Sequence, residues 1–367
     1  MSEEEFTKKL SKEALESLNL WLNSKERELY KEEINTLISE NNFAELEDRF
    51  YKHIEVGTGG IRGQLGAGSN RINLRIIGEA AQGLSQFIED FGQVAKEKGV
   101  VVGHEARKMS IEFAELCCRV FAANGIKTYL FDSLRSTPEI SFAVRHLGTI
   151  AGVQLTASHN PRTDNGFKFY WSDGGQVVPP ADLKFMELVK KVTEIKTMNF
   201  ESACTQGLVT MIGTEVDKAY IDAIKQLTLV KNRSAKIVFS PIHGAGSTNV
   251  LPVLKESGFD VTVVPEQEKP DENFPRRALQ HGRIVGGLRK RRQNRRIGPG
   301  FAAKSTYEYF GLVCHGRSRL PVSRGQSPWG EFVAQLHLCG TDHRAGDRIL
   351  VQVSPARKRR RSAVFAL

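Results

Sequence analysis

An alternation of amphipathic helices and short apolar runs restricts the fold of this chain more than any other feature of its sequence. From residue 76 onward the predicted elements are a helix at 76–87, a strand at 100–102, a helix at 110–124, a strand at 127–131, a helix beginning at Thr137-Pro138 and a strand at 150–155. Ser110 is the predicted cap of the second helix. Strands that alternate with helices are typical of an α/β protein, so we expect a mixed or parallel sheet flanked by helices.

The same pattern returns further along the chain and divides it. The second group has a helix at 214–228, a strand at 237–239, a helix at 247–257 and a strand at 261–264, while two acidic helices precede the first group. The glycine-dense stretch 55–70 is predicted to be irregular. We therefore predict N-terminal helices at 1–44, a first domain at 45–205, a partial second domain at 206–275 and a tail at 276–367.

The basic charge is confined to the tail. The chain has a formal net charge of +10, but residues 276–367 hold 17 Arg with only 3 Lys and 4 acidic residues, so the rest is net acidic. No run of eighteen apolar residues occurs, and the acidic start at Met1 is unlike a leader peptide. Five cysteines without a Cys-x-x-Cys spacing are typical of a reducing compartment. We expect a cytoplasmic protein with no membrane span.

The tail admits several interpretations. Its arginine clusters at 289–296 and 357–361 would contact nucleic-acid phosphates, but no aromatic residues are interleaved with them, so nucleic acid is not the expected partner. Its cysteines and histidines between 314 and 343 match no common zinc spacing. A disordered extension or an out-of-frame translation fits the composition better.

The loop after the predicted strand 150–155 holds the strongest candidate for a catalytic group. It reads Thr-Ala-Ser-His-Asn-Pro over 156–161, and Asn-Gly-Phe-Lys follows over 165–168. Ligands of open α/β sheets bind beyond the carboxyl ends of the strands, where Ser158 would lie. His159 would supply an acid or base, Asn160 a polar amide and Lys168 a cation. The alternative is a turn built from ordinary turn-forming residues.

Two glycine-containing loops are further candidates. Gly-Thr-Gly-Gly-Ile-Arg-Gly over 57–63 frees backbone amides beside Arg62, a combination suited to binding an anion such as phosphate. Ser-Pro-Ile-His-Gly-Ala-Gly over 240–246 again joins a predicted strand to a predicted helix. The structural alternatives are a tight turn in the first loop and a plain strand-to-helix turn in the second.

These strings, in this order, resemble one family. The three loops above, followed by Val-Pro-Glu-Gln over 264–267 and Pro-Asp-Glu-Asn-Phe-Pro over 270–275, are similar to motifs of the α-D-phosphohexomutases. Within that family they resemble the branch of phosphoglucomutases that also contains phosphopentomutases. The resemblance runs from near the N-terminus to Pro275, and it implies a phosphohexomutase domain I followed by part of domain II.

The resemblance implies an isomerase of the phosphoglucomutase/phosphomannomutase type. In such enzymes a phosphoserine, here Ser158, interconverts hexose 1-phosphate and hexose 6-phosphate through a sugar bisphosphate. Mg²⁺ held partly by the phosphate on Ser158, and a hexose bisphosphate activator, are the implied cofactors. The implied catalytic residues are Ser158, His159, Arg62 and Lys168, and the implied substrate- or phosphate-binding residues are Thr58, Gly59, Arg62, Asn160 and Lys168.

One departure from the family keeps other functions open. The family's Asp-x-Asp-x-Asp-Arg magnesium loop is missing, and Thr341 to Arg348 lacks its three alternating carboxylates. The break in composition after Pro275 suggests a frameshift, which reading the gene in its other two frames tests. The alternative functions are a noncatalytic sugar-phosphate-binding protein and a nucleic-acid-binding protein that acts through its basic tail.

Overall fold

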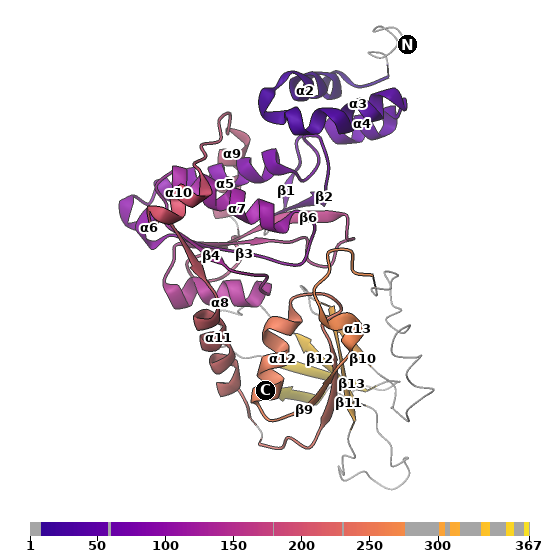
Figure 1. Ribbon diagram of the computed structural model, residues 1–367, viewed down its shortest axis with the longest axis vertical. Helices are drawn as coiled ribbons and strands as arrows, with labels where there is room; N and C mark the ends of the chain where they lie inside the picture. Colours follow the sequence, from indigo (N-terminus) through magenta and orange to yellow (C-terminus); the bar gives the residue numbers. More distant parts are fainter. Residues whose placement is uncertain are drawn as a thin grey trace.

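A computed structural model describes residues 9–57, 60–178, 180–229 and 231–275, together with the backbone of five short strands beyond position 300. The described part is elongated, with a helical N-terminal unit at one end, a seven-stranded sheet in the middle and a second α/β unit at the other end (Figure 1). No helix within these ranges combines the length and the apolar character that a membrane crossing needs.

The N-terminal unit is a small helical bundle with its own core. It comprises α2 (Lys12–Asn23), a 3-10 helix η1 (Lys25–Tyr30), α3 (Lys31–Ser39) and α4 (Phe43–Phe50). Ser11 caps α2 and Asn42 caps α4, because each side-chain oxygen accepts a hydrogen bond from a backbone N–H three residues later. The Trp21 ring packs edge-on against Tyr30 and Phe50 at the centre of this bundle.

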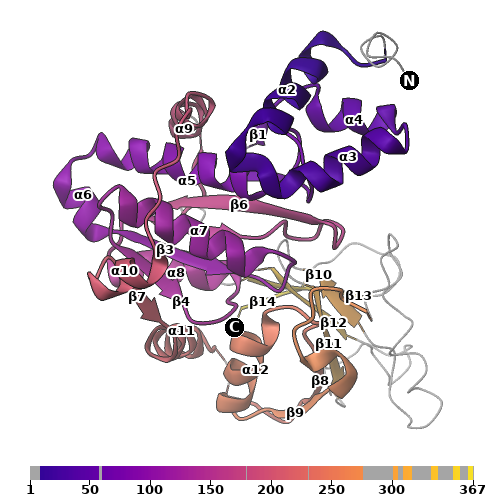
Figure 2. The same cartoon turned by 45° about the horizontal axis from the view of Figure 1, so that its top comes forward.

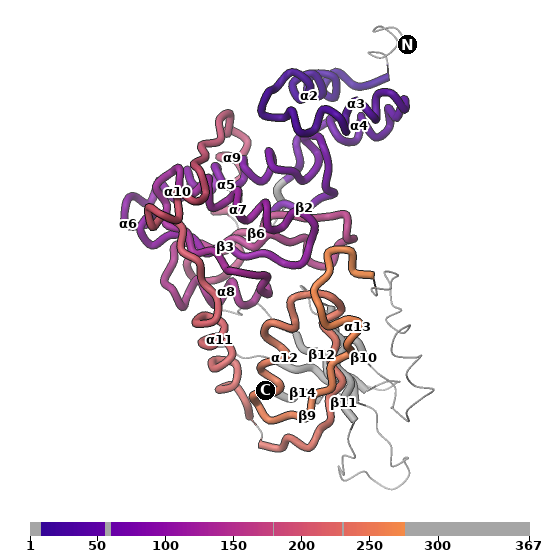
Figure 3. Tube along the Cα trace, viewed as in Figure 1, coloured from indigo at the N-terminus to yellow at the C-terminus, as the bar shows by residue number. Residues whose placement is uncertain are grey.

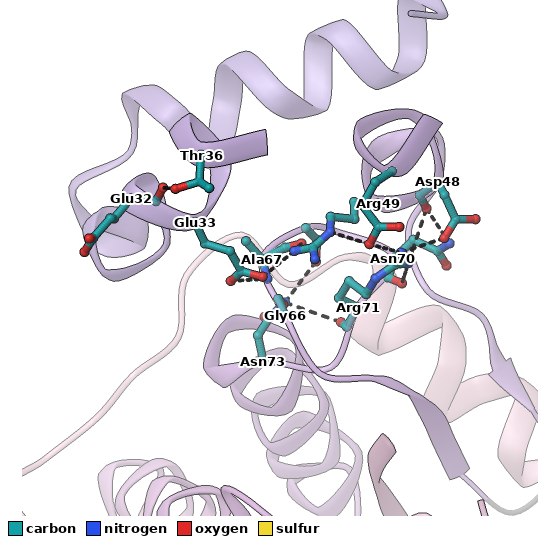
Figure 4. A network of polar contacts seen from close by, with 12 residues as sticks. Glu32, Glu33, Thr36, Asp48, Arg49, Gly66, Ala67, Asn70, Arg71 and Asn73 are labelled. Atoms are coloured by element: carbon teal, nitrogen blue, oxygen red, sulfur yellow. Dashed lines mark hydrogen bonds and ion pairs between the residues drawn. The ribbon is translucent and has the colours of Figure 1, made fainter. Parts of the chain in front are cut away.

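A network of charged side chains connects this bundle to the loop before α5 (Leu74–Glu89), as Figure 4 shows. Arg49 pairs with Glu33 at 2.5 Å, and Glu33 also accepts a hydrogen bond from the backbone N–H of Ala67. Arg71, which is buried, pairs with Asp48 at 2.6 Å. Because three of these side chains come from the bundle and the other two residues from the loop, the bundle and the first sheet form one packed structure.

The first sheet has seven strands in the order β1-β2-β6-β5-β3-β4-β7. Strands β5, β3, β4 and β7 run parallel, whereas β6 is antiparallel to both of its neighbours, β5 and β2. The fold prediction of a mixed sheet is therefore confirmed. The strands are β1 (Val56–Gly57), β2 (Gly60–Gln64), β3 (Val100–His104), β4 (Thr128–Phe131), β5 (Ala151–Leu155), β6 (Asp164–Trp171) and β7 (Val209–Ile212).

Helices cover both faces of this sheet (Figures 1 and 2). Alternate strand residues face opposite sides, so that Val100 and Val102 join one core while Val101 joins the other. The first core lies under α5, α7 and α9, and the second lies under α8. The flanking helices are α5 (Leu74–Glu89), α6 (Gln93–Lys98), α7 (Ser110–Ala123), α8 (Thr137–Leu147), α9 (Ala181–Lys190) and α10 (Phe200–Thr205).

The second unit begins with α11 (Thr214–Gln226) and contains the parallel strands β8 (Lys236–Ser240) and β9 (Asp260–Val263). They are connected by α12 (Gly246–Glu256), and α13 (Pro265–Glu268) follows β9. Phe239 and Leu251 lie in its small core.

Five strands lie beyond position 300. Two of them, β10 (Phe301–Lys304) and β11 (Tyr309–His315), extend the sheet of the second unit in the order β10-β11-β8-β9. The other three, β12 (Phe332–His337), β13 (Leu350–Pro355) and β14 (Ala363–Ala366), form a third sheet.

Several elements differ from the sequence-based expectations. The stretch 55–70 contains β1 and β2, although it was predicted to be irregular. Its glycines permit this pairing, because a Cβ atom at Gly60 would lie 2.1 Å from the carbonyl oxygen of Phe167 on β6.

Ser110 is the first residue of α7 and not its cap, a position that Met109 takes with a left-handed φ of 66°. The first sheet extends through β7, past the predicted boundary at 205, and α4 crosses the predicted boundary at 44. The tail at 276–367, predicted to be disordered or out of frame, lies outside the described residues apart from the backbone of the five strands named above.

Candidate active site

Ser158 lies in the loop that follows β5, at the carboxyl end of the parallel part of the sheet. The residue is 6% exposed, and its backbone is left-handed, with a φ of 58°. The Oγ atom lies 3.3 Å from Nδ1 of His159, whose side chain is exposed. The structure therefore holds a nearly buried hydroxyl beside an accessible imidazole, at the sheet edge where α/β proteins bind ligands.

A buried chain of hydrogen bonds supports this loop from below. The N–H of Ser158 donates to Oγ1 of Thr156 at 2.9 Å, and the Thr156 hydroxyl donates to Glu105 at 2.5 Å. Glu105 accepts a second hydrogen bond, of 3.0 Å, from Thr137 at the start of α8. Sequence reasoning missed Glu105 and Thr156. The available signal was position, because Glu105 directly follows β3 and Thr156 directly follows β5, its neighbour in the sheet.

Lys168 reaches the same network from β6. Its side chain is 0% exposed, and its Nζ atom lies 3.5 Å from Oγ1 of Thr137, which in turn donates to Glu105. Burying an ammonium group is costly unless polar groups surround it. The predicted cation is therefore buried inside the protein, and the hydroxyl group of Thr137 links it to the Glu105 carboxylate.

Arg62 lies on β2, on the other side of β6 from Ser158's strand β5. Its Cα pairs across the sheet with Gly166, and its side chain is exposed. A Cβ atom at Gly166 would lie 2.2 Å from the carbonyl oxygen of Ile61, 3.0 Å from that of Thr156 and 3.2 Å from the Cα of Arg62. The missing side chain at Gly166 thus lets the backbone of Arg62 approach the segment that leads to Ser158.

Replacing Gly166 by alanine is therefore expected to destabilise the protein. The added methyl group overlaps backbone atoms of β2 and of Thr156, which cannot rotate away, so we expect a loss of about 1 to 3 kcal/mol in the free energy of unfolding. Urea unfolding measures this loss. Gly207→Ala is the control, because no atom lies within 4 Å of a Cβ there, although Gly207 has a positive φ of 71°. A smaller loss for Gly166→Ala than for the control would contradict the argument.

The two asparagines of the Ser158 region have different surroundings. The amide of Asn160 donates to Asp164 at 2.9 Å, within the same loop. Asn165 donates to the carbonyl of Lys108 and to the hydroxyl of Ser110, and thereby ties β6 to the start of α7. Thr58 and Gly59, the other predicted phosphate-binding residues, lie outside the described residues.

The loop 240–246 forms hydrogen bonds with other residues of the second α/β unit. Ser240 donates to the side chain of Gln267 at 2.7 Å, and Nδ1 of His243 lies 3.0 Å from the carbonyl oxygen of Lys269. Ile242 and His243 both have positive φ angles, which such contacts hold in place. This geometry favours a structural role for the 240–246 motif, as a strand-to-helix turn that binds α13 and the segment after it.

The described residues do not by themselves offer a metal site. Within them, no group of three or more His, Cys, Asp or Glu side chains is arranged to hold an ion. Asp164 is the acidic residue in the Ser158 loop, and it accepts the hydrogen bond from Asn160. A Mg²⁺ ion needs about six oxygen ligands, so this part of the chain does not supply a complete set.

Comparison with known proteins identifies both α/β units. Residues 53–196 match phosphoglucomutase/phosphomannomutase alpha/beta/alpha domain I, and residues 218–282 match domain II of the same family. The chain is 32% identical to a human phosphopentomutase over 70% of its own length and 44% of the relative's. It is also 32% identical to a phosphoglucomutase of Staphylococcus saprophyticus, over 71% and 47%.

A solved structure agrees with these matches. A protein from Thermus thermophilus named as a phosphomannomutase has 26% sequence identity and a TM-score of 0.51, with 61% of this chain and 48% of that one covered. The chain spans about half the length of the curated relatives it matches. The resemblance seen in the motifs is thereby confirmed, and the chain belongs to the phosphoglucomutase/phosphomannomutase family.

Proposed function

We propose that Ser158 carries a phosphoryl group and exchanges it with a sugar monophosphate. The proposed reaction interconverts hexose 1-phosphate and hexose 6-phosphate through a hexose bisphosphate, which also serves as the activator. The observation that carries this proposal is the setting of Ser158, a nearly buried hydroxyl at the end of β5 whose backbone is held by Thr156. Phosphoryl transfer needs accurate positioning and fixed charge more than unusual covalent chemistry.

The surrounding side chains suit this reaction. His159 lies 3.3 Å from the Ser158 hydroxyl and is exposed, so it is the proposed acid or base toward a sugar hydroxyl. Lys168 supplies a fixed positive charge from the interior, and Arg62 a second one from the exposed face of β2. Asn160 keeps a second amide hydrogen for phosphate, and Thr58 and Gly59 complete the proposed binding set.

The proposed cofactor is Mg²⁺, with the phosphate on Ser158 as one of its ligands. When bound, such an ion would neutralise charge on the transferring phosphoryl group. The described residues do not provide its remaining ligands. The roles proposed for His159, Lys168 and Arg62 rest on their own positions and on no contact with the ion.

Phosphorylation of the chain tests this proposal directly. We expect the full chain, incubated with Mg²⁺ and glucose 1,6-bisphosphate, to gain one phosphoryl group on Ser158 in intact-mass and peptide mass spectra. A parallel incubation with ribose 1,5-bisphosphate tests a pentose donor, because the name of one relative, phosphopentomutase, indicates a pentose. The ratio of the two phosphorylation rates decides between a hexose and a pentose substrate.

Two variants complete the test. Ser158→Ala is expected to gain no phosphoryl group. Ser240→Ala is a matched control, because Ser240 is also a buried serine at the carboxyl end of a parallel strand, and it should gain one as the unmodified sequence does. A chain that takes up no phosphoryl group, or a gain that persists in Ser158→Ala, would overturn the assignment.

A further inference from the structure

We propose that Arg107 is the positioning residue of the Ser158 loop, and that Phe274 of the second unit covers its guanidinium group. This inference rests on the proposed function, because its consequence is the rate at which Ser158 accepts a phosphoryl group. Sequence reasoning assigned no role to either residue.

Four backbone carbonyls of one loop converge on Arg107. Its Nη2 atom donates to the carbonyls of Ser158 at 2.7 Å and Asn160 at 3.0 Å. Its Nη1 atom donates to those of Pro161 at 2.9 Å and Asp164 at 2.7 Å. The guanidinium group is rigid and planar, so these four bonds together fix the path of the chain from 158 to 164.

The peptide groups on both sides of Ser158 are held by residues of one turn. Arg107 binds the Ser158 carbonyl, while Glu105, two residues earlier, binds Thr156, which accepts from the Ser158 N–H. Ser158 has a left-handed backbone, which a residue other than glycine keeps only when its surroundings enforce it. The turn between β3 and α7 therefore determines the conformation of the proposed nucleophile.

The turn that carries Arg107 is itself fixed. The N–H of Arg107 donates to the carbonyl of Glu105, and its carbonyl accepts from the N–H of Ser110, the first residue of α7. Arg107 as a whole is only 5% exposed. Its guanidinium group is thus anchored from behind by the parallel sheet and is buried against the loop that it binds.

The second unit reaches the same guanidinium group. The Phe274 ring centre lies 5.9 Å from Cζ of Arg107, a cation–π geometry, and Arg162 of the Ser158 loop lies 3.5 Å from the carbonyl oxygen of Asn273. The segment that carries Phe274 is tied to its own unit, since the N–H of Asp271 donates to the carbonyl of His243. Figure 3 shows this segment, after α13, returning to the first sheet. Docking of the second unit is thereby linked to the position of Ser158.

The decisive variant is Arg107→Lys, which keeps a positive charge but cannot donate to four carbonyls. At saturating glucose 1,6-bisphosphate we expect the rate of Ser158 phosphorylation to fall by about 10²-fold, while the concentration of bisphosphate that gives half the maximal rate changes little. We also expect the hydrogen-bonded backbone N–H groups of Ser158, Asn160 and Asp164 to exchange their hydrogens at least about tenfold faster. Phe274→Leu should produce smaller changes of the same kind.

Arg119→Lys is the matched control. Arg119 also donates to a backbone carbonyl, that of Met198, but it lies nine residues along α7 from Ser110, about 14 Å away along the helix axis. We expect its phosphorylation rate and its exchange within 158–164 to equal those of the unmodified chain. Thermal unfolding of all variants separates a local effect from general loss of structure.

Three results would overturn the proposal. Arg107→Lys could leave the phosphorylation rate and the hydrogen exchange unchanged, or it could change them by no more than Arg119→Lys does. The third such result is a set of changes in Arg107→Lys that are fully explained by a lower unfolding temperature. If Arg107→Lys does not fold, Phe274→Leu decides alone, and its failure to speed exchange within 158–164 counts against the proposal. A chain that takes up no phosphoryl group defeats the proposed function, whereas the exchange measurement still tests the role of Arg107.

Discussion

Replacing Lys168 by methionine is expected to slow phosphorylation of Ser158 by about 10² to 10³-fold while raising the free energy of unfolding by about 1 kcal/mol. Methionine keeps the packing of the lysine stem and removes the cost of burying an ammonium group, because Lys168 is 0% exposed. We expect the slower phosphorylation and the higher free energy of unfolding together, because a charge that is buried for function lowers the stability of the folded protein.

Mass spectrometry over time and urea unfolding measure the two quantities. Lys127→Met is the control, because Lys127 is exposed just before β4, and neither quantity should change by more than a small amount. A methionine variant at 168 that accepts phosphate at the normal rate would remove Lys168 from the proposed catalytic set. A large loss of stability would mean that its charge holds the fold together.

Replacing Glu139 by glutamine is expected to flatten the pH dependence of stability. Glu139 lies on α8 and is 0% exposed, and Asn249 of α12 donates to it at 3.3 Å, so it lies at the contact between the two units. Burial, and then the neighbouring carboxylate of Asp217, raise the pKa of Glu139 from its ordinary value of 4.5 to about 8. Asp217 is itself held by Arg135 through two hydrogen bonds, of 2.6 and 2.8 Å.

The sign follows from proton binding. Between pH 4.5 and about 8 the folded chain keeps a proton on Glu139 that the unfolded chain releases, so this residue makes stability fall as the pH rises across that window. The slope is on the order of 1.4 kcal/mol for each pH unit. Glutamine resembles the protonated acid at every pH, so Glu139→Gln should be the more stable form at pH 8 and differ least from the parent near pH 4.5.

Urea unfolding at several pH values between 4.5 and 8.5 measures the difference. Glu115→Gln serves as the control, because Glu115 is an exposed glutamate on α7, and its curve should run parallel to that of the parent chain. Parallel curves for Glu139→Gln and the parent would show that Glu139 is ionised in the folded protein across this range.

Local signals in the sequence predicted most of the regular elements. Apolar periodicity located α5, α7, α8, α11 and α12, and the parallel strands other than β7, to within a few residues, because burial of one helix face or of a whole strand imposes that pattern. Apolar periodicity did not predict β2 and β6, because their glycines and polar residues are typical of loops. These strands depend on each other, since Gly60 and Gly166 leave the space in which the two backbones pair.

The family and the loop that carries Ser158 could be identified from the amino-acid sequence alone, because those motifs are contiguous and their residue types are specific. The folded structure was needed to find that Lys168 is buried, that Glu105 and Thr156 form hydrogen bonds that support Ser158, and that Arg107 holds the carbonyls of a loop 51 residues away. Such contacts depend on which strands become neighbours and on the direction in which each side chain leaves its strand or turn. That information exists only once the sheet has formed, since residues distant in the chain are then brought to one edge.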